Sequence, residues 1–210
     1  MTPMMEQYFE IKNKYKDFLL FYRLGDFYEM FFDDAILASR ELELTLTGRD
    51  CGEEERAPMC GVPYHSSETY IGRLIEKGYK VALCEQMEDP ALAKGLVRRD
   101  VTRVITPGTL IESNLLKETQ NNYLCAVFFD TEEIGVCFAD VSTGQAFATS
   151  FGGKEMLSKL NTELSTYMPS EIILNVSIES LPDRGQFIHE RVSSLISDNQ
   201  SMRFDYATSY

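Results

Sequence analysis

The sequence has few of the residues that bind zinc. Only two histidines are present, His65 and His189, and the cysteines have no CxxC spacing. A zinc site usually takes four Cys or His ligands, two of them close together in the chain. The cysteines are odd in number and stand mostly in apolar segments, so we expect buried, reduced thiols and no metal. They are Cys51, Cys60, Cys84, Cys125 and Cys137.

Long hydrophobic runs are also missing. No segment approaches the length of about 20 apolar residues that spans a bilayer. Pro3, Glu6 and Glu10 stand where a signal peptide would be apolar. We therefore expect a cytoplasmic protein with no membrane partner. Its 210 residues, 44% of them hydrophobic, are enough to build the core of one large domain or two ordinary ones.

Positive charge is scarce along the whole chain. The 20 Lys and Arg residues face 33 Asp and Glu residues, a formal net charge of −13. Neutralising phosphates supplies most non-specific affinity for nucleic acid, so this composition is not that of a basic DNA-binding domain. Residues 94–103 are the exception, with Lys94, Arg98, Arg99 and Arg103 against Asp100. We expect any phosphate contact to involve that segment, although a short mixed-charge run is usually solvated surface.

Strand and helix signals alternate in the first half of the sequence. Thr2 and Pro3 begin a helix whose apolar residues recur at helical spacing, at positions 4, 8, 11 and 15. The apolar run 18–24 ends at the turn pair Gly25-Asp26. A helix is expected over 33–43 with Ile36, Leu37 and Leu42 inside, and another from 66 or 67 to Gly78. Strands are expected at 18–24, 27–29, 45–47, 58–62, 79–83 and 101–106, with an exposed loop over 48–55.

The second half has a different rhythm. Residues 123–129, 134–141 and 145–150 read as three strands joined by short turns, followed by a helix over 154–167 and a strand over 171–174. This order resembles the opening of a ribonuclease-H-like fold. The predicted fold class is α/β, of the α+β kind. We expect a mixed-sheet domain over 1–112, a linker over 113–122 and a partial second domain over 123–210, because the chain ends without a stop signal.

One motif, residues 25–31, combines an aromatic ring and a carboxylate two positions apart. In an extended strand Phe27 and Glu29 point to the same side. A ring stacks on any base, and a neighbouring carboxylate tests a base's hydrogen-bonding edge. However, seven of the fifteen residues 18–32 are Phe or Tyr, a density more typical of burial. These residues alone leave both readings open.

Four segments in order decide between them. They are FYRLGDFYEMFFDDA at 21–35, LTLTGRD at 44–50, PMCGVPYHS at 58–66 and VTRVITPGT at 101–109. Together they resemble the bacterial MutS family of DNA mismatch repair proteins, strongly over residues 1–150 and weakly beyond. The resemblance implies a mismatch-recognition domain followed by part of a connector domain.

The resemblance also implies roles for individual residues. Phe27 would enter the minor groove and stack on a mispaired base, and Glu29 would hydrogen-bond that base. Met59 and His65 would line the same edge, together with Pro63 and Tyr64.

Phosphate contacts are expected from Arg99 and Arg103. On a regular strand these two arginines share a face with Val101, and Arg98 lies on the opposite face.

Partners and cofactors follow from the resemblance as well. It implies mismatched double-stranded DNA, a MutL-type repair partner bound through the connector, and a parent protein that is a homo-oligomer. It implies no cofactor and no enzymatic activity for this chain, with ATP and magnesium belonging to an ATPase region of the longer protein.

Two other classes of function are considered. Asp130 and Asp140 fall at strand ends and would be the acids of a metal-dependent nuclease, although turns favour Asp at such places in any case. Alternatively, the acidic surface would serve as a protein-interaction module with Phe27 buried.

Overall fold

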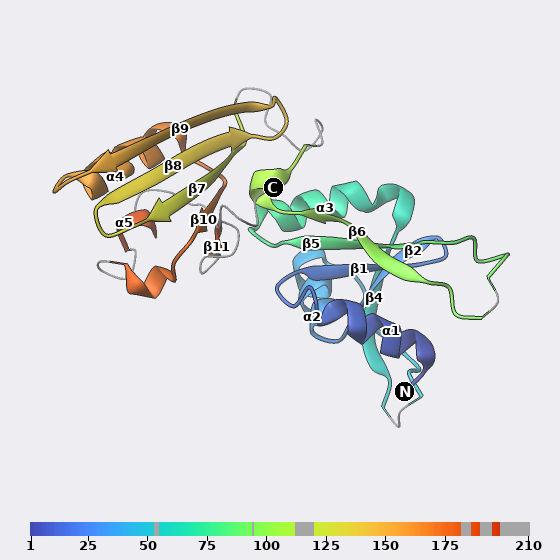
Figure 1. Ribbon diagram of the computed structural model, residues 1–210. Coiled ribbons are helices and arrows are strands. Elements are labelled where there is room, and N and C mark those ends of the chain that lie inside the picture. The colour runs from blue at the N-terminus through green and yellow to red at the C-terminus, as the bar shows by residue number, and fades with distance from the viewer. Residues whose placement is uncertain (53–54, 94, 112–119, 182–185, 190–194, 198–210) are drawn as a thin grey trace. The chain divides into compact units, whose positions relative to one another are not determined.

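The computed structural model describes residues 1–52, 55–93, 95–111, 120–181, 186–189 and 195–197 (Figure 1). The chain divides into two compact units, Met1–Thr106 and Pro107–Tyr210. Each unit contains a mixed sheet, so the predicted α+β class is confirmed. Most of the linker predicted over 113–122 lies outside the described residues.

The first unit is built on a six-stranded sheet in the order β3-β4-β2-β1-β5-β6. Strand β1 pairs parallel with β5, and the other neighbouring strands are antiparallel. The elements are α1 (Pro3–Lys12), β1 (Leu19–Leu24), β2 (Phe27–Phe31), α2 (Phe32–Leu42), β3 (Thr47–Arg49), β4 (Ala57–Pro63), the 3-10 helix η1 (Tyr64–Ser66), α3 (Ser67–Glu76), β5 (Val81–Gln86) and β6 (Arg99–Ile105).

Helix α1 covers one face of this sheet. Its buried residues are Met5, Tyr8 and Ile11, one residue away from the predicted Met4 at the start of the face. The Tyr8 ring meets Phe31 of β2 and Tyr22 of β1 edge to face, with ring centroids 5.1 and 5.5 Å apart. Such aromatic pairs contribute about 0.5–1.5 kcal/mol each beyond burial. The helix therefore packs against the C-terminal end of β2, opposite to the end that carries Phe27.

The buried side of α2 differs in part from the prediction, because Leu42 is buried as predicted but Ile36 is not. Ile36 is 49% exposed, whereas Ala35 and Ala38 are buried. The buried Asp34 sets this rotation, because its carboxylate accepts the backbone N–H of Leu20 at 3.0 Å. A charged side chain that caps a strand N–H outweighs the pattern of the larger apolar residues.

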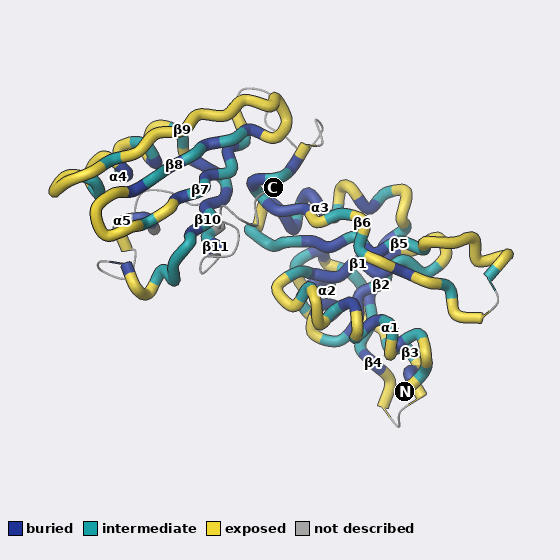
Figure 2. Tube along the Cα trace, viewed as in Figure 1, coloured by how far each residue is buried: buried dark blue, intermediate teal, exposed yellow. Residues whose placement is uncertain are grey.

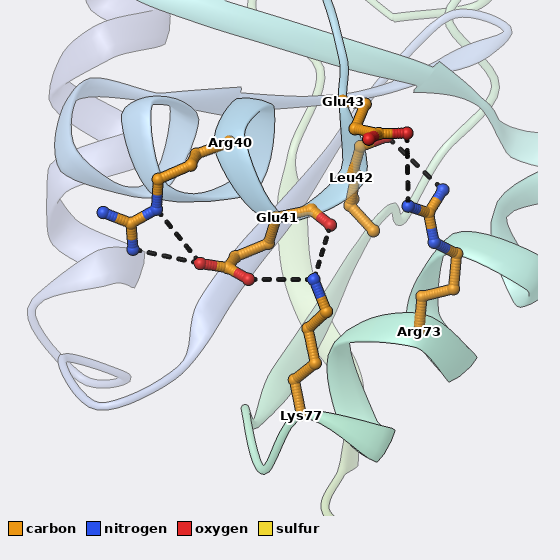
Figure 3. A network of polar contacts seen from close by, with 6 residues as sticks. All are labelled: Arg40, Glu41, Leu42, Glu43, Arg73 and Lys77. Atoms are coloured by element: carbon orange, nitrogen blue, oxygen red, sulfur yellow. Dashed lines mark hydrogen bonds and ion pairs between the residues drawn. The ribbon is translucent and has the colours of Figure 1, made fainter.

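Helices α2 and α3 are joined through the end of α2 (Figure 3). Lys77 donates to the backbone oxygen of Glu41 and pairs with its carboxylate, both at 2.9 Å. Arg73 donates to the Leu42 carbonyl at 3.4 Å and lies 4.0 Å from the Glu43 carboxylate. These cations satisfy the last carbonyls of α2 at the negative end of its dipole.

The second unit contains a five-stranded sheet in the order β11-β10-β7-β8-β9. The predicted meander, helix and fourth strand are confirmed, with bounds within two residues. The elements are the 3-10 helix η2 (Pro107–Thr109), β7 (Tyr123–Phe129), β8 (Glu133–Asp140), β9 (Gln145–Gly152), α4 (Met156–Tyr167), β10 (Glu171–Leu174), the 3-10 helix η3 (Ile178–Ser180), α5 (Gln186–His189) and β11 (Leu195–Ser197). Strand β10 is parallel to β7 and β11. Figure 2 shows the edge strand β9 exposed along most of its length, in agreement with its burial pattern.

The five cysteines are unbridged, and all except Cys137 are buried. The predicted buried, reduced thiols are confirmed for these four. Burial raises the pKa of Cys60 to about 11 and that of Cys84 to about 12, so both are thiols at neutral pH.

The described helices are short. The longest of them, α4, has 12 residues, and among the described residues no helix is both long and apolar enough to cross a membrane.

Candidate nucleic-acid interface

The most prominent feature of the first unit is an aromatic ring at the tip of the β1–β2 hairpin. Gly25 turns the chain with φ +59°, and Leu24 pairs with Phe27 directly after the turn. The Phe27 ring is 48% exposed, whereas Tyr28 and Phe31 of the same strand are buried. Burial, which the density of aromatic residues favoured, is therefore wrong for Phe27.

The tip is braced from the face of the sheet opposite Phe27. The backbone N–H of Tyr64 donates to the Asp26 carbonyl at 2.9 Å. The Arg23 guanidinium lies 3.6 Å from the centre of the Tyr64 ring and 3.6 Å from the Glu85 carboxylate. The Tyr28 hydroxyl donates to that same carboxylate. Burial first, and then Glu85, raise the pKa of Tyr28, so its hydroxyl stays protonated and remains a donor.

Strand pairing places Glu29 and Met59 on the face that bears Phe27. Phe27 pairs with Pro63, Glu29 with Gly61, and Phe31 with Met59. Residues that pair across antiparallel strands share a face, as do residues two positions apart. A Cβ at Gly61 would be tight against the Tyr28 carbonyl oxygen, at 3.2 Å, and in ordinary contact with Glu29 Cγ, at 3.5 Å, so the Glu29 stem lies directly against this glycine.

The Glu29 carboxylate forms an ion pair that sequence reasoning missed. Its Oε2 contacts Nη1 of Arg49, which ends β3. Residues 48–55 were predicted to be an exposed loop, yet Thr47–Arg49 is a strand paired with β4. The motif at 44–50 contains Arg49, but sheet order was needed to connect that arginine with β2.

His65 is exposed, and it directly follows Tyr64, whose backbone N–H donates to Asp26 at the hairpin tip. It belongs to η1. Its ring packs edge to face against the Tyr64 ring, with ring centroids 5.9 Å apart. The structure therefore places His65 two positions after Pro63, the strand partner of Phe27.

Arg99 is buried in the first unit and is 8% exposed. Its guanidinium stands 5.1 Å from the centre of the Tyr22 ring. It donates to the carbonyl oxygen of Arg23 at 2.7 Å, to that of Val97 at 3.0 Å and to Gln7 Oε1 at 3.2 Å. These bonds use the guanidinium to hold α1, β1 and the start of β6 together.

The predicted common face of Arg99, Val101 and Arg103 is wrong. Cys84 pairs with Val101, whereas its neighbour Leu83 pairs with Arg103, so β6 has one extra residue at this point. A bulge of this kind moves all later side chains to the other face. Arg103 therefore lies on the face opposite Arg99.

The proposed nuclease pair is not assembled. Asp140 pairs with Tyr123 at the start of β7, and Asp130 follows the end of that strand. The two acids are thus separated by the length of β7, roughly 20 Å at the usual rise per residue. No metal ion can bind both carboxylates at such a separation. Among the described residues, no group of three His, Cys, Asp or Glu side chains is placed to hold a metal ion.

Instead, Asp140 organises the β8–β9 turn. Its Oδ1 accepts from the Ser142 N–H at 2.9 Å, the Ser142 hydroxyl at 2.6 Å and the Thr143 N–H at 3.3 Å. Its Oδ2 accepts from the Asn122 N–H at 3.3 Å. Burial acts to raise the pKa of Asp140, but these hydrogen bonds outweigh it and hold that pKa below its ordinary value.

Comparison with known proteins matches both units to domains of the same protein family. Residues 2–114 match MutS domain I, and residues 122–209 match MutS domain II. The fold and these matches define a MutS-type pair of domains.

The chain is also similar to whole proteins. It is 53% identical over 208 residues to the DNA mismatch repair protein MutS of Ruminiclostridium cellulolyticum, covering 99% of this chain and 24% of that protein. It is 59% identical over 175 residues to that of Caldicellulosiruptor bescii, covering 83% of this chain and 20% of that protein. The chain belongs to the MutS family. It spans about a fifth to a quarter of the length of these relatives.

Proposed function

We propose that this chain reads mispaired bases in double-stranded DNA and that Phe27 is the probe. The observation that carries the proposal is the half-exposed Phe27 ring at a braced hairpin tip. An apolar wedge inserted from the minor groove unstacks a base step at a cost of a few kcal/mol. A mispaired step yields at lower cost than a matched one, so the same wedge discriminates through deformability.

We assign Glu29 to the displaced base. It shares the face of Phe27 two residues further along β2, so a base stacked on the ring lies within reach of its carboxylate. Met59 and His65 are proposed to line the same edge, next to the strand partners of this hairpin.

Phosphate positioning is assigned to Arg103 and to the exposed Arg98, rather than to Arg99. The guanidinium of Arg99 already has three acceptors within the protein, and its role is to hold the start of β6 in place. Arg98 directly precedes β6, so the buried Arg99 side chain also fixes the position of Arg98 next to the sheet.

The wider setting is a proposal for the whole protein. The relatives are named as DNA mismatch repair proteins, and most of their length lies outside this match. We assign no catalysis to this chain, and ATP and magnesium to the remaining length. A MutL-type partner is proposed to bind the second unit, within a cytoplasmic homo-oligomer.

The test compares the full-length protein with Phe27→Ala in binding to a G·T duplex and its matched control at one stated salt concentration. Phe27→Ala is expected to lower the preference for the mismatch at least about fivefold, because stacking on an aromatic ring contributes about 1–3 kcal/mol per base.

Phe147→Ala is the matched control. This phenylalanine is 45% exposed in the second unit, so it is a ring of similar exposure without the proposed role. Its variant should keep the wild-type preference. An unchanged preference in Phe27→Ala would overturn the proposal.

A further inference from the structure

The Glu29 carboxylate is placed where an unpaired charge is unfavourable. Its side chain is 16% exposed, it stands between Tyr22 and Gly61 on the neighbouring strands, and the proposed ligand is a polyanion. A partly desolvated carboxylate needs a cation or hydrogen-bond donors. The described residues supply Arg49 for this purpose, with a side chain that is 36% exposed.

The ion pair crosses a strand of the sheet. Arg49 pairs with Ala57 of β4, and Glu29 pairs with Gly61 of the same strand. Met59 stands between these two β4 residues on the same face. The pair therefore lies on the face that carries Phe27, with the Glu29 stem next to Gly61.

The ion pair involves one nitrogen of the Arg49 guanidinium and one oxygen of the Glu29 carboxylate. Arg49 reaches Oε2 of Glu29 through Nη1. A carboxylate has two oxygens that accept hydrogen bonds, so Oε1 can meet a base N–H while Oε2 stays paired. The planar guanidinium constrains the orientation of the carboxylate, which a rounded ammonium does less well.

We propose that Arg49 is a positioning residue for mismatch readout, holding the Glu29 carboxylate in orientation beside Phe27 and balancing its charge against the DNA phosphates. This inference rests on the proposed function. Because the effect acts through Glu29, Arg49 contributes to mismatch preference only when the acid is present.

The experiment is a double-mutant cycle in the full-length protein. Arg49→Met removes the charge at similar length, Glu29→Gln removes the acid, and the third variant carries both changes. Dissociation constants are measured for a G·T duplex and its matched control over a series of salt concentrations. We expect Arg49→Met to lower the preference about tenfold, the loss of one charged hydrogen bond. In the Glu29→Gln background the same change should alter the preference less than about twofold.

Two further variants separate positioning from folding. Arg49→Lys keeps the charge and should recover part of the preference. Arg40→Met removes an exposed arginine that is also paired with a glutamate, Glu41, and should leave the preference unchanged. Thermal unfolding of each variant confirms that the first unit is intact, and a poorly folded Arg49→Met is replaced by Arg49→Gln in the same cycle.

The outcomes that overturn the inference are distinct from failure of the proposed function. If Arg49→Met weakens binding to both duplexes equally, reduces the salt dependence and does so with or without Glu29, then Arg49 is a phosphate contact. If Arg49→Met changes nothing while Phe27→Ala abolishes the preference, the inference alone fails. If Phe27→Ala also changes nothing, the proposed function fails with it.

Discussion

The two units each contain a tight turn between antiparallel strands, and the two turns are stabilised differently. Gly25 and Gly144 both take a left-handed backbone, with φ +59° and +73°, and each turn includes an aspartate. Asp140 satisfies its own turn through its side chain. Asp26 accepts the Tyr64 N–H through its carbonyl oxygen, and Arg23 of β1 donates to the Gly25 carbonyl while its guanidinium lies over the Tyr64 ring, so the β1–β2 tip is held in part by Tyr64 of η1.

This difference shows how a hairpin can present a side chain. Three of the four hydrogen bonds to the Asp140 carboxylate come from Ser142 and Thr143 within the turn itself, and the fourth comes from Asn122. The β1–β2 turn is supported on one face by η1 and β5, which leaves the other face for Phe27.

The largest expected effect comes from Asp140. In Asp140→Ala the N–H groups of Asn122, Ser142 and Thr143 lose their acceptor, and we expect the free energy of unfolding to fall by about 2–3 kcal/mol. Denaturant unfolding measures it. Asp130→Ala is the control, because Asp130 is exposed and, among the described residues, its side chain bonds only the neighbouring Thr131. A similar loss in both variants would mean that the hydrogen bonds of Asp140 do not contribute more to the free energy of unfolding than those of Asp130.

The same residue gives a pH signature. The folded pKa of Asp140 lies below its ordinary value of about 4. Its contribution to stability is therefore present above that value and is lost as the pH falls toward the folded pKa. Wild type should lose more stability than Asp140→Asn between pH 5 and pH 3 in urea unfolding. Parallel pH curves for the two proteins would contradict this.

A smaller effect is expected from the brace of the other turn. Tyr64→Ala removes the ring beneath Arg23 and should cost about 1 kcal/mol of stability, as a cation–π contact does. Mismatch preference in the full-length protein should fall, but less than in Phe27→Ala, because the probe is loosened and not removed. Tyr64→Phe keeps the ring and should behave as wild type. Equal preference in Tyr64→Ala and wild type would show that the brace does not position Phe27.

The smallest expected effects come from the turn glycines, Gly25 and Gly144. A Cβ at Gly25 or Gly144 would meet no heavy atom of the described residues within 4 Å, so an alanine at either costs only backbone strain. Both changes to alanine should lower the free energy of unfolding by about 1 kcal/mol. Only Gly25→Ala should also reduce mismatch preference. Matched losses of preference in both variants would remove the distinction between the two turns.

Features that depend on neighbours in the chain could be predicted from the sequence. The Gly25-Asp26 turn, the meander β7 to β9 and the strand β10 follow from local patterns, and the structure has them within two residues. The turn signal also predicts that a strand begins at Phe27, as it does, although local composition does not predict that the ring is exposed.

Features that depend on sheet order and irregular pairing could not be predicted in this way. Arg49 meets Glu29 only because β4 lies between β3 and β2. Arg103 changes face because one extra residue enters β6, which leaves no signal in the alternation of the sequence. Arg99 is buried against Gln7, 92 positions away, where its charge has acceptors that no local pattern reveals.

The parallel pairing of β1 with β5 has a consequence for how the first unit folds. Leu19 and Val81 meet across about 60 residues of intervening chain, whereas β1 and β2 are joined by a two-residue turn. Closing a long loop costs more chain entropy than closing a short one, and non-local pairing is slow. We therefore expect the β1–β2 hairpin to form early and β5 and β6 to add late. Docking of β6 then brings Arg99 to the carbonyl of Arg23, so the last strand to arrive locks the first hairpin to form.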